Sequence, residues 1–288
     1  MRRACIDIGS NTTRLLVAEC DGKRLLEVHQ ERSFTRIGQD QRSDGTISSS
    51  KQAEVVQVVA EQLQSARDLG ALDVRAVATA SIRRAANGQA LIGAIADACG
   101  LAVKVLSEQE EARLAFVGAA RTLGHVPAGD LGVVDVGGGS SEIAIGRAPD
   151  QVHWSASFAV GSGEIADACL RSDPPSPQEL GQARVRVSEV LAGVRVPRPA
   201  EAVAVGGSAA SLRRLAGSRL DQEGFRRALA LLVSERTTDL ARRFALDPER
   251  VRLLPAGLVI LQAVSELLGA PLEVGCGGVR EGILLEAG

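Results

Sequence analysis

The order of apolar and polar positions predicts strands that alternate with helices. Short apolar runs, typical of buried strands, are separated by segments in which apolar residues recur every three or four positions, as at Val55, Val59 and Leu63. In the first half the predicted strands cover residues 4–8, 15–17, 74–78 and 103–106, and the predicted helices cover residues 50–69, 89–99 and 108–123. A polar loop is expected over residues 38–48. This alternation indicates an α/β fold.

The second half opens by repeating the start of the chain. The matching positions are Asp7 and Asp135, Gly9 and Gly137, Thr12 and Ser140, and Leu15 and Ile143. An internal repeat at almost half the chain length predicts two similarly built domains that face a shared cleft. We expect an N-terminal domain over residues 1–124 and a C-terminal domain over residues 125–288.

The rest of the second half continues the same alternation. Strands are expected over residues 153–158 and 202–205, and a short helix after the glycine turn at residues 275–278. Further helices are expected over residues 221–234, 234–244 and 255–268, and one that begins at Pro177 with Ser176 as its N-cap.

Composition narrows the class of protein. Of the 288 residues, 45% are hydrophobic and 24% charged, a balance typical of a folded globular chain. The formal net charge of −2 provides no positive field for nucleic acid or an acidic membrane, so we expect neither as a partner. The apolar run over residues 253–264 is shorter than the roughly 18 residues of a membrane span. Asp7 interrupts the N-terminal apolar stretch, which argues against a signal peptide and predicts a cytoplasmic protein.

Three predicted strands end in glycine-rich turns, at residues 9–12, 137–141 and 206–208. Glycine lets backbone N–H groups converge on one point, which suits phosphate oxygens, and serine or threonine hydroxyls add donors. Single glycine turns are usually structural, but two of these three follow an aspartate at the same position. We therefore predict a phosphate-binding cleft. Its candidate residues are Gly9, Ser10, Asn11, Thr12, Gly137, Gly138, Gly139, Ser140, Gly206, Gly207 and Ser208. The chain lacks the GxxxxGK[ST] pattern of a P-loop.

Acidic residues next to these turns are candidates for a metal site. Asp7, Asp135 and Glu142 supply the hard oxygen ligands that Mg²⁺ requires. The structural alternative makes the two aspartates hydrogen-bonded turn residues and Glu142 a solvent-facing strand residue. The five cysteines are scattered and never spaced as CxxC, so no zinc site is expected.

With these residues assembled, the chain resembles the short, two-domain form of the Ppx/GppA phosphatase family, the exopolyphosphatases and guanosine pentaphosphate phosphohydrolases. The matching segments are residues 7–12 (DIGSNT), 36–38 (RIG), 78–83 (ATASIR), 110–114 (EEARL), 135–142 (DVGGGSSE), 206–208 (GGS) and 277–282 (GGVREG). The resemblance implies two actin-like domains, of the ribonuclease H-like fold shared by sugar kinases and Hsp70, facing an interdomain cleft. It also leaves a homodimer possible.

The resemblance further implies Mg²⁺-dependent hydrolysis of terminal phosphoanhydride bonds. Orthophosphate would be released from inorganic polyphosphate, from pppGpp to give ppGpp, or from both. The family's catalytic glutamate corresponds to Glu111, which would assist the attacking water. Asp7, Asp135 and Glu142 match its metal-binding acids, and Arg83 matches a phosphate-binding arginine, although by composition alone Arg83 would be a solvated side chain.

Two features depart from the family pattern. The additional C-terminal helical domains of longer members have no counterpart in this sequence. Glu164 stands where the family often has an arginine, and the negative charge of this glutamate would disfavour a long polyanion. Two alternative functions stay open: a non-catalytic sensor of polyphosphate or an alarmone, and an ATP-using enzyme of the same fold group.

Overall fold

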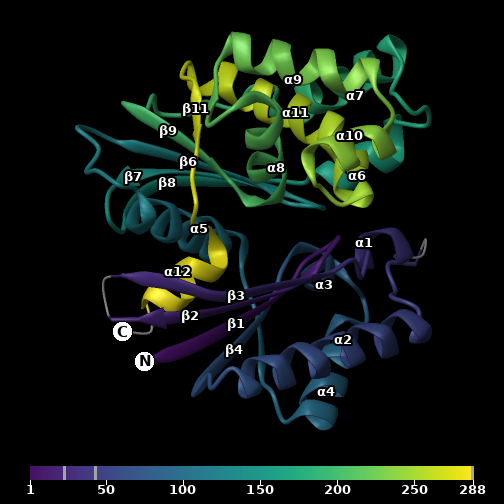
Figure 1. Ribbon diagram of the computed structural model, residues 1–288, viewed down its shortest axis with the longest axis vertical. Coiled ribbons are helices and arrows are strands. Elements are labelled where there is room, and N and C mark those ends of the chain that lie inside the picture. The colour runs from purple at the N-terminus through teal and green to yellow at the C-terminus, as the bar shows by residue number, and fades with distance from the viewer. Residues whose placement is uncertain (22–23, 42–43, 287–288) are drawn as a thin grey trace.

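The computed structural model describes residues 1–21, 24–41 and 44–286. They form two lobes, each built around one mixed sheet, with helices between the two sheets (Figure 1). The first sheet has the strand order β3-β2-β1-β4-β5. Its strands are β1 (Arg2–Ile8), β2 (Thr13–Cys20), β3 (Leu25–Ser33), β4 (Asp73–Ala78) and β5 (Val103–Val105).

The second sheet repeats this arrangement, with the order β10-β11-β9-β6-β7-β8. Its strands are β6 (Leu131–Val136), β7 (Ser141–Arg147), β8 (Gln151–Phe158), β9 (Glu201–Val205), β10 (Arg219–Leu220) and β11 (Leu272–Val274). β6 pairs antiparallel with β7 and parallel with β9, as β1 pairs with β2 and β4. The predicted internal repeat and the α/β fold of two similar halves are confirmed.

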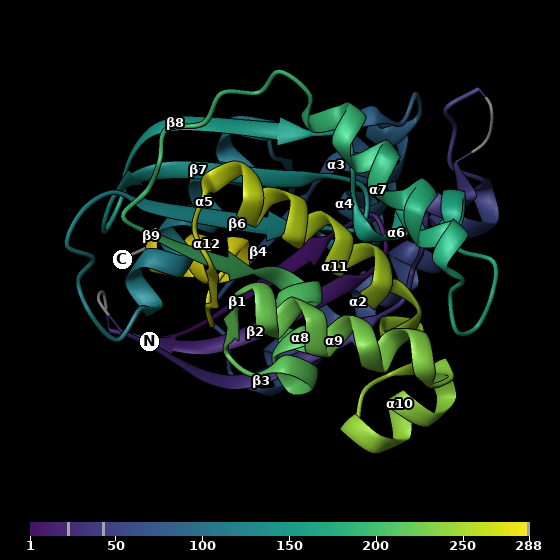
Figure 2. The same cartoon turned by 90° about the horizontal axis from the view of Figure 1, so that it is seen from above.

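Most of the remaining helices lie on the outer face of each sheet, while one short helix from each lobe contacts the other lobe (Figures 1 and 2). The helices of the first lobe are α1 (Ile37–Asp40), α2 (Ser49–Asp68), α3 (Ala80–Arg84) and α4 (Gly88–Cys99). Those of the second lobe are α6 (Ser162–Cys169), α7 (Pro177–Leu191), α8 (Gly206–Ala216), α9 (Gln222–Ser234), α10 (Thr237–Phe244) and α11 (Pro248–Leu268). The predicted start of α7 is confirmed: Ser176 is its N-cap and forms a capping box with Glu179, and Pro177 occupies the first turn.

Two helices lie between the sheets, α5 (Glu108–Thr122) and α12 (Val279–Glu286) (Figure 1). Leu114 of α5 joins an apolar cluster with Leu16 of the first sheet, whereas Phe116 packs into a cluster with the second sheet. α12 packs against α5 and against β1, β2 and β3. Backbones touch at this crossing, because a Cβ on Gly118 would lie 1.9 Å from the carbonyl oxygen of Gly278. The middle layer therefore joins the two lobes by close packing.

The predicted division between residues 124 and 125 falls between α5 and β6 and stays a prediction. Residues 279–286, which follow the second sheet in sequence, lie against the first sheet.

The helix predicted from residue 255 begins earlier, at Pro248, where Asp247 caps it and accepts from the N–H of Glu249. Pro255 therefore lies inside α11 rather than at its start. With 21 residues, α11 is long and apolar enough to cross a membrane by length and composition, and 67% of its most apolar window is buried inside the fold. Such burial is typical of a core helix, so its length is weak evidence for a membrane span.

Several elements were not predicted. β3 carries polar residues at most positions because it is an edge strand, and α1, α3, β10 and β11 are too short to show a period. α6 follows a glycine turn that was expected only as a turn. The predicted loop over residues 38–48 begins inside α1, and its residues 42–43 lie outside the described residues.

Candidate active site

The repeat brings the same hairpin turn into the cleft from each lobe. After β1, the N–H of Gly9 donates to the carbonyl oxygen of Thr12 at 3.0 Å. After β6, the N–H of Gly137 donates to the carbonyl oxygen of Ser140, also at 3.0 Å. Two equivalent glycine-rich turns therefore border one space.

The two turns touch each other. A Cβ on Gly139 would lie 2.5 Å from Oγ of Ser10, and a Cβ on Gly138 would lie 2.9 Å from Cβ of Asn11. Side chains at these glycines would push the lobes apart, so this close approach requires glycine.

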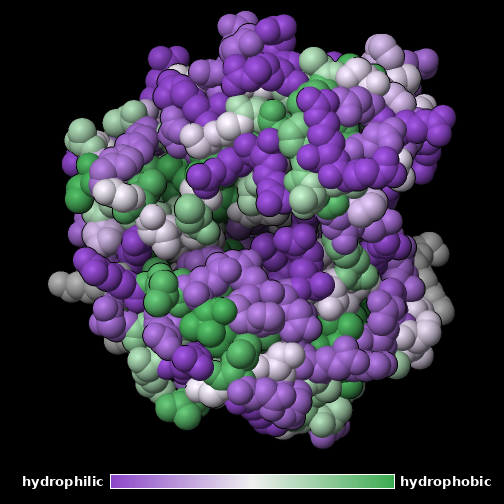
Figure 3. Space-filling view, viewed as in Figure 1, coloured by the Kyte–Doolittle hydropathy of each residue, from purple (hydrophilic) through white to green (hydrophobic). Residues whose placement is uncertain are grey.

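A cavity of about 200 Å³ opens between the lobes at these turns. Figure 3 shows this face of the molecule hollowed between the lobes, with hydrophilic residues around the hollow. The predicted site residues that line the cavity are Asp7, Gly9, Ser10, Asn11, Thr12, Glu111, Asp135, Gly137, Gly138, Gly139, Ser140, Glu142, Gly206 and Gly207. The structure thus gathers residues that are far apart in the sequence into one cleft.

Two predicted residues do not line this cavity. Ser208 lies in the first turn of α8, fully buried next to Gly257 of α11, and its hydroxyl oxygen has no hydrogen-bond partner among the described residues. Arg83 turns toward α5: its guanidinium donates to Oε2 of Glu111 at 3.0 Å and to the carbonyl oxygen of Leu106 at 2.8 Å. The predicted phosphate roles of both residues stay predictions.

Glu111 lies in the first turn of α5 and is only 7% exposed. Burial raises its pKa to about 7, although the hydrogen bond and charge of Arg83 act in the opposite direction. A carboxylate whose pKa lies near neutrality can exchange a proton with water at physiological pH.

Three further carboxyl groups share the cleft. Burial, and then the charge of Asp7, raises the pKa of Asp135 to about 6, and burial also raises the pKa of Asp7. Glu142 is 2% exposed, which excludes the solvent-facing alternative. Burial, together with the charge of Glu111, raises its pKa well above the ordinary value, and its Oε1 accepts from Oγ of Ser157 at 2.8 Å.

The same acids bear on the predicted metal site. Oδ1 of Asp7 is buried without a hydrogen-bond partner among the described residues, as expected of an oxygen kept for another ligand. Over residues 1–21, 24–41 and 44–286, no group of three or more His, Cys, Asp or Glu side chains is placed to hold a metal ion. Mg²⁺ usually takes one or two carboxylates together with waters and substrate phosphates, so this donor set fits it.

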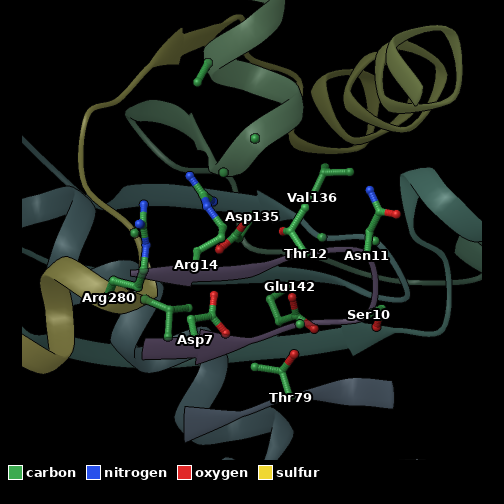
Figure 4. Close-up of a pocket in the computed structure, with 18 of the residues that line it drawn as sticks. Asp7, Ser10, Asn11, Thr12, Arg14, Thr79, Asp135, Val136, Glu142 and Arg280 are labelled. Carbon is green, nitrogen blue, oxygen red and sulfur yellow. The ribbon is translucent and has the colours of Figure 1, made fainter. Parts of the chain in front are cut away.

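Sequence reasoning missed a cluster of arginines in the cleft: Arg14, Arg250 and Arg280 all line it. Figure 4 shows Arg14 and Arg280 at one side of the cavity, with Ser10, Asn11 and Thr12 at the other. The charge of Arg280, followed by burial, lowers the pKa of Arg14 to about 9. Like charges held this close favour an anion between them.

Arg250 is the most buried member of this cluster, and a Cβ on Gly207 would lie 2.7 Å from its guanidinium carbon. Burial, and then the charge of Arg32, lowers its pKa to about 10, and its Nε has no partner among the described residues. Arg14 could have been found, because it is the cross-strand neighbour of the candidate Asp7 in the hairpin of β1 and β2. Arg250 could not, because the helix predicted from residue 255 began after it.

Glu164 does not line this cleft. It lies in the first turn of α6, where its Oε1 is 3.3 Å from a guanidinium nitrogen of Arg186. The effect expected of Glu164 on long polyanions stays a prediction.

The sequence is similar to those of known proteins along almost its whole length. An uncharacterized protein of Streptomyces coelicolor is 30% identical over 99% of this chain and 90% of its own length. Exopolyphosphatase 1 of Mycobacterium leprae is 26% identical over 99% of this chain and 89% of its own length.

Solved structures of similar proteins have the same fold. The crystal structure of the Ppx/GppA family member of Aquifex aeolicus matches with a TM-score of 0.82 and 26% identity, covering 100% of this chain and 97% of the other. This similarity confirms the predicted α/β fold of two similarly built domains. The sequence profile of the Ppx/GppA phosphatase family matches residues 16–287. The chain belongs to the Ppx/GppA phosphatase family.

Proposed function

We propose that this protein is an exopolyphosphatase that removes the terminal phosphate of inorganic polyphosphate, of pppGpp to give ppGpp, or of both. The observation that carries the proposal is the meeting of the two glycine turns beside Glu111, in a cleft that also holds three arginines. The similarity to an exopolyphosphatase along almost the whole chain supports it.

In this proposal Glu111 acts as the base. Its carboxylate takes a proton from water as the water oxygen attacks the terminal phosphorus. The bond from that phosphorus to the bridging oxygen breaks, and the shortened chain leaves with the bridging oxygen. Phosphoryl transfer depends on position and charge neutralisation more than on covalent chemistry, and a buried carboxylate with a pKa of about 7 suits the proton transfer.

The turns and arginines would hold the substrate. Backbone N–H groups of the turns at Gly9 and Gly137 would face the terminal phosphate from opposite lobes, and Arg14, Arg250 and Arg280 would neutralise the phosphates behind it.

Mg²⁺ is part of the proposal, held by one or two of Asp7, Asp135 and Glu142. When bound, the ion would neutralise charge on the phosphate oxygens. Excess carboxylate in the cleft and the unpartnered Oδ1 of Asp7 support this assignment.

The experiment is phosphate release by the purified protein with Mg²⁺, from long-chain polyphosphate, short polyphosphate, pppGpp and ATP. Glu111→Gln is the control for contaminating phosphatase, since it keeps the size of the side chain and removes the base. Release from polyphosphate or pppGpp that disappears in Glu111→Gln would support the proposal and identify the substrate.

Other outcomes point to the alternatives. Turnover of ATP alone would favour an ATP-using enzyme. Tight binding of polyphosphate or pppGpp without release would favour a sensor. Equal release by Glu111→Gln would remove this residue from the mechanism.

A further inference from the structure

A second cavity lies on the other side of the two touching turns. It has a volume of about 730 Å³ and is lined by both lobes. Ser10, Asn11, Gly138 and Gly139 line this second cavity and also the cleft, so the two turns form the wall between them. If the two turns moved apart, the cleft and the second cavity would become continuous.

Each turn is fixed from behind by a helix of its own lobe. The N–H of Gly38 in α1 donates to the carbonyl oxygen of Ser10 at 2.8 Å. The N–H of Gly163 in α6 donates to the carbonyl oxygen of Gly138 at 3.0 Å. Any change in the distance between α1 and α6 is therefore transmitted to the wall.

Exposed polar contacts join the lobes on this side. Nε2 of Gln39 in α1 donates to both carboxylate oxygens of Asp167 in α6, at 2.9 and 2.8 Å. Arg36 and Glu249 form an ion pair of 2.9 Å between the same two lobes. Exposed pairs of this kind contribute little to stability, whereas the opposite side is held by the apolar packing of α5 and α12. The α1–α6 side is thus the side on which the lobes separate more easily.

The second cavity offers positive charge to an anion. Arg84 and Arg171 line it, and among the described residues neither guanidinium forms an ion pair with a carboxylate. Its two acids are already paired: Asp167 lies 2.9 Å from Arg252, and Glu164 lies 3.3 Å from its arginine partner on α7. This balance suits a small dianion such as orthophosphate.

We propose that the second cavity receives the orthophosphate formed in the cleft and passes it to solvent. The inference rests on the proposed function. The terminal phosphate would lie at the turns, with the remaining chain held in the cleft by Arg14 and Arg250. After hydrolysis the shortened chain still fills the cleft, so orthophosphate needs a different path to solvent. Separation of α1 from α6 would open the wall, while the chain stays on its arginines.

The test compares phosphate formed with phosphate released, using short-chain polyphosphate and Mg²⁺. Acid quenching counts phosphate formed on the enzyme, and a fluorescent phosphate-binding reporter counts only phosphate that has left it. Ala168→Trp places a bulky side chain in the second cavity, and Arg171→Glu reverses a charge there. In both variants we expect first-turnover formation within about twofold of the unchanged protein, but release and steady-state turnover slowed about fivefold or more.

Matched controls lie outside both cavities: Ala53→Trp on the exposed side of α2 and Arg184→Glu on α7 should behave as the unchanged protein. Release as fast as in the unchanged protein in both test variants would overturn the proposal, as would equal slowing of formation and release. If acid quenching of the unchanged protein finds no phosphate from any substrate, the proposed function itself is wrong, and the exit is wrong with it.

Discussion

Arg83 and Glu111 are joined by a hydrogen bond of 3.0 Å from the guanidinium to the carboxylate, and Glu111 lines the cleft while Arg83 does not. A second bond, from Arg83 to the carbonyl oxygen of Leu106, fixes the guanidinium at the end of β5. The arginine thereby sets where the carboxylate of Glu111 points.

This relationship predicts that Arg83 acts on turnover through Glu111. In Arg83→Gln we expect kcat for polyphosphate to fall about tenfold or more, with KM changed less than about twofold. Arg75→Gln, an exposed arginine on β4, is the control. The sharper measurement is polyphosphate affinity in Glu111→Gln and in the double variant Glu111→Gln, Arg83→Gln. Equal affinities are expected, and a large loss in the double variant would show that Arg83 binds phosphate directly.

The buried acids predict a stability that falls as pH rises. Asp135 and Glu111 have ordinary pKa values of 3.8 and 4.5, which the fold raises to about 6 and about 7. Between these limits the folded state binds more protons than the unfolded state, so the free energy of unfolding decreases with pH. The fold lowers the pKa values of Glu110 and Glu179 from 4.5 to about 2, so these two residues make stability rise with pH, but only up to about their ordinary pKa of 4.5.

Thermal unfolding of the protein with a chelator should therefore show a lower Tm at pH 8 than at pH 5. Glu111→Gln should flatten this dependence, because the amide does not titrate. Added Mg²⁺ should raise the Tm most at pH 8, where the carboxylates are ionised. A Tm that increases steadily from pH 5 to pH 8 would contradict the prediction.

The contact between the turns predicts that Gly139→Ala impairs turnover. Its Cβ would lie 2.5 Å from Oγ of Ser10, so the lobes or the serine must move, and we expect kcat to fall about tenfold or more. Gly93→Ala is the matched control, since nothing lies within 4 Å of a Cβ there and Gly93 lies inside α4. That control should raise the free energy of unfolding by about 0.5–1 kcal/mol. Wild-type kcat in Gly139→Ala would show that the turns need not touch.

The arginine cluster predicts a salt-dependent affinity for the polyanion. Arg250→Gln should raise KM for polyphosphate about tenfold and reduce its dependence on ionic strength, while kcat changes little. Arg214→Gln, whose guanidinium bonds to backbone carbonyls of residues 244 and 245 away from the cleft, is the control. If Arg250→Gln and Arg214→Gln have the same KM as each other at low salt, and again at high salt, Arg250 does not contact the substrate.

Much of this site was predictable because its residues sit in repeated local patterns. The sequence places Asp7 and Asp135 two residues before a glycine at the end of an apolar strand. Within each sheet a parallel pair, β1 with β4 and β6 with β9, puts such an end beside the end of its neighbour, and the internal repeat predicts that the two ends face one cleft. Arg250 carried no such mark, since its helix was expected to begin at Pro255 and it enters the cleft only through packing of α11 on α8. Arg83 illustrates the opposite limit: its motif predicts a phosphate ligand, which stays a prediction, whereas the hydrogen bond of its side chain to Glu111 depends on the position of α5, which no local pattern reveals.

The position of α12 sets an order on how the chain can become native. The first sheet is synthesised before the second, yet the face of β1, β2 and β3 that points to the middle layer is covered by residues 279–286. Many domains fold as units from the N-terminus while the chain is still being made. Here the first lobe cannot bury this face until the strands of the second sheet and residues 279–286 have been synthesised, so the last step in folding of the first lobe waits for the second.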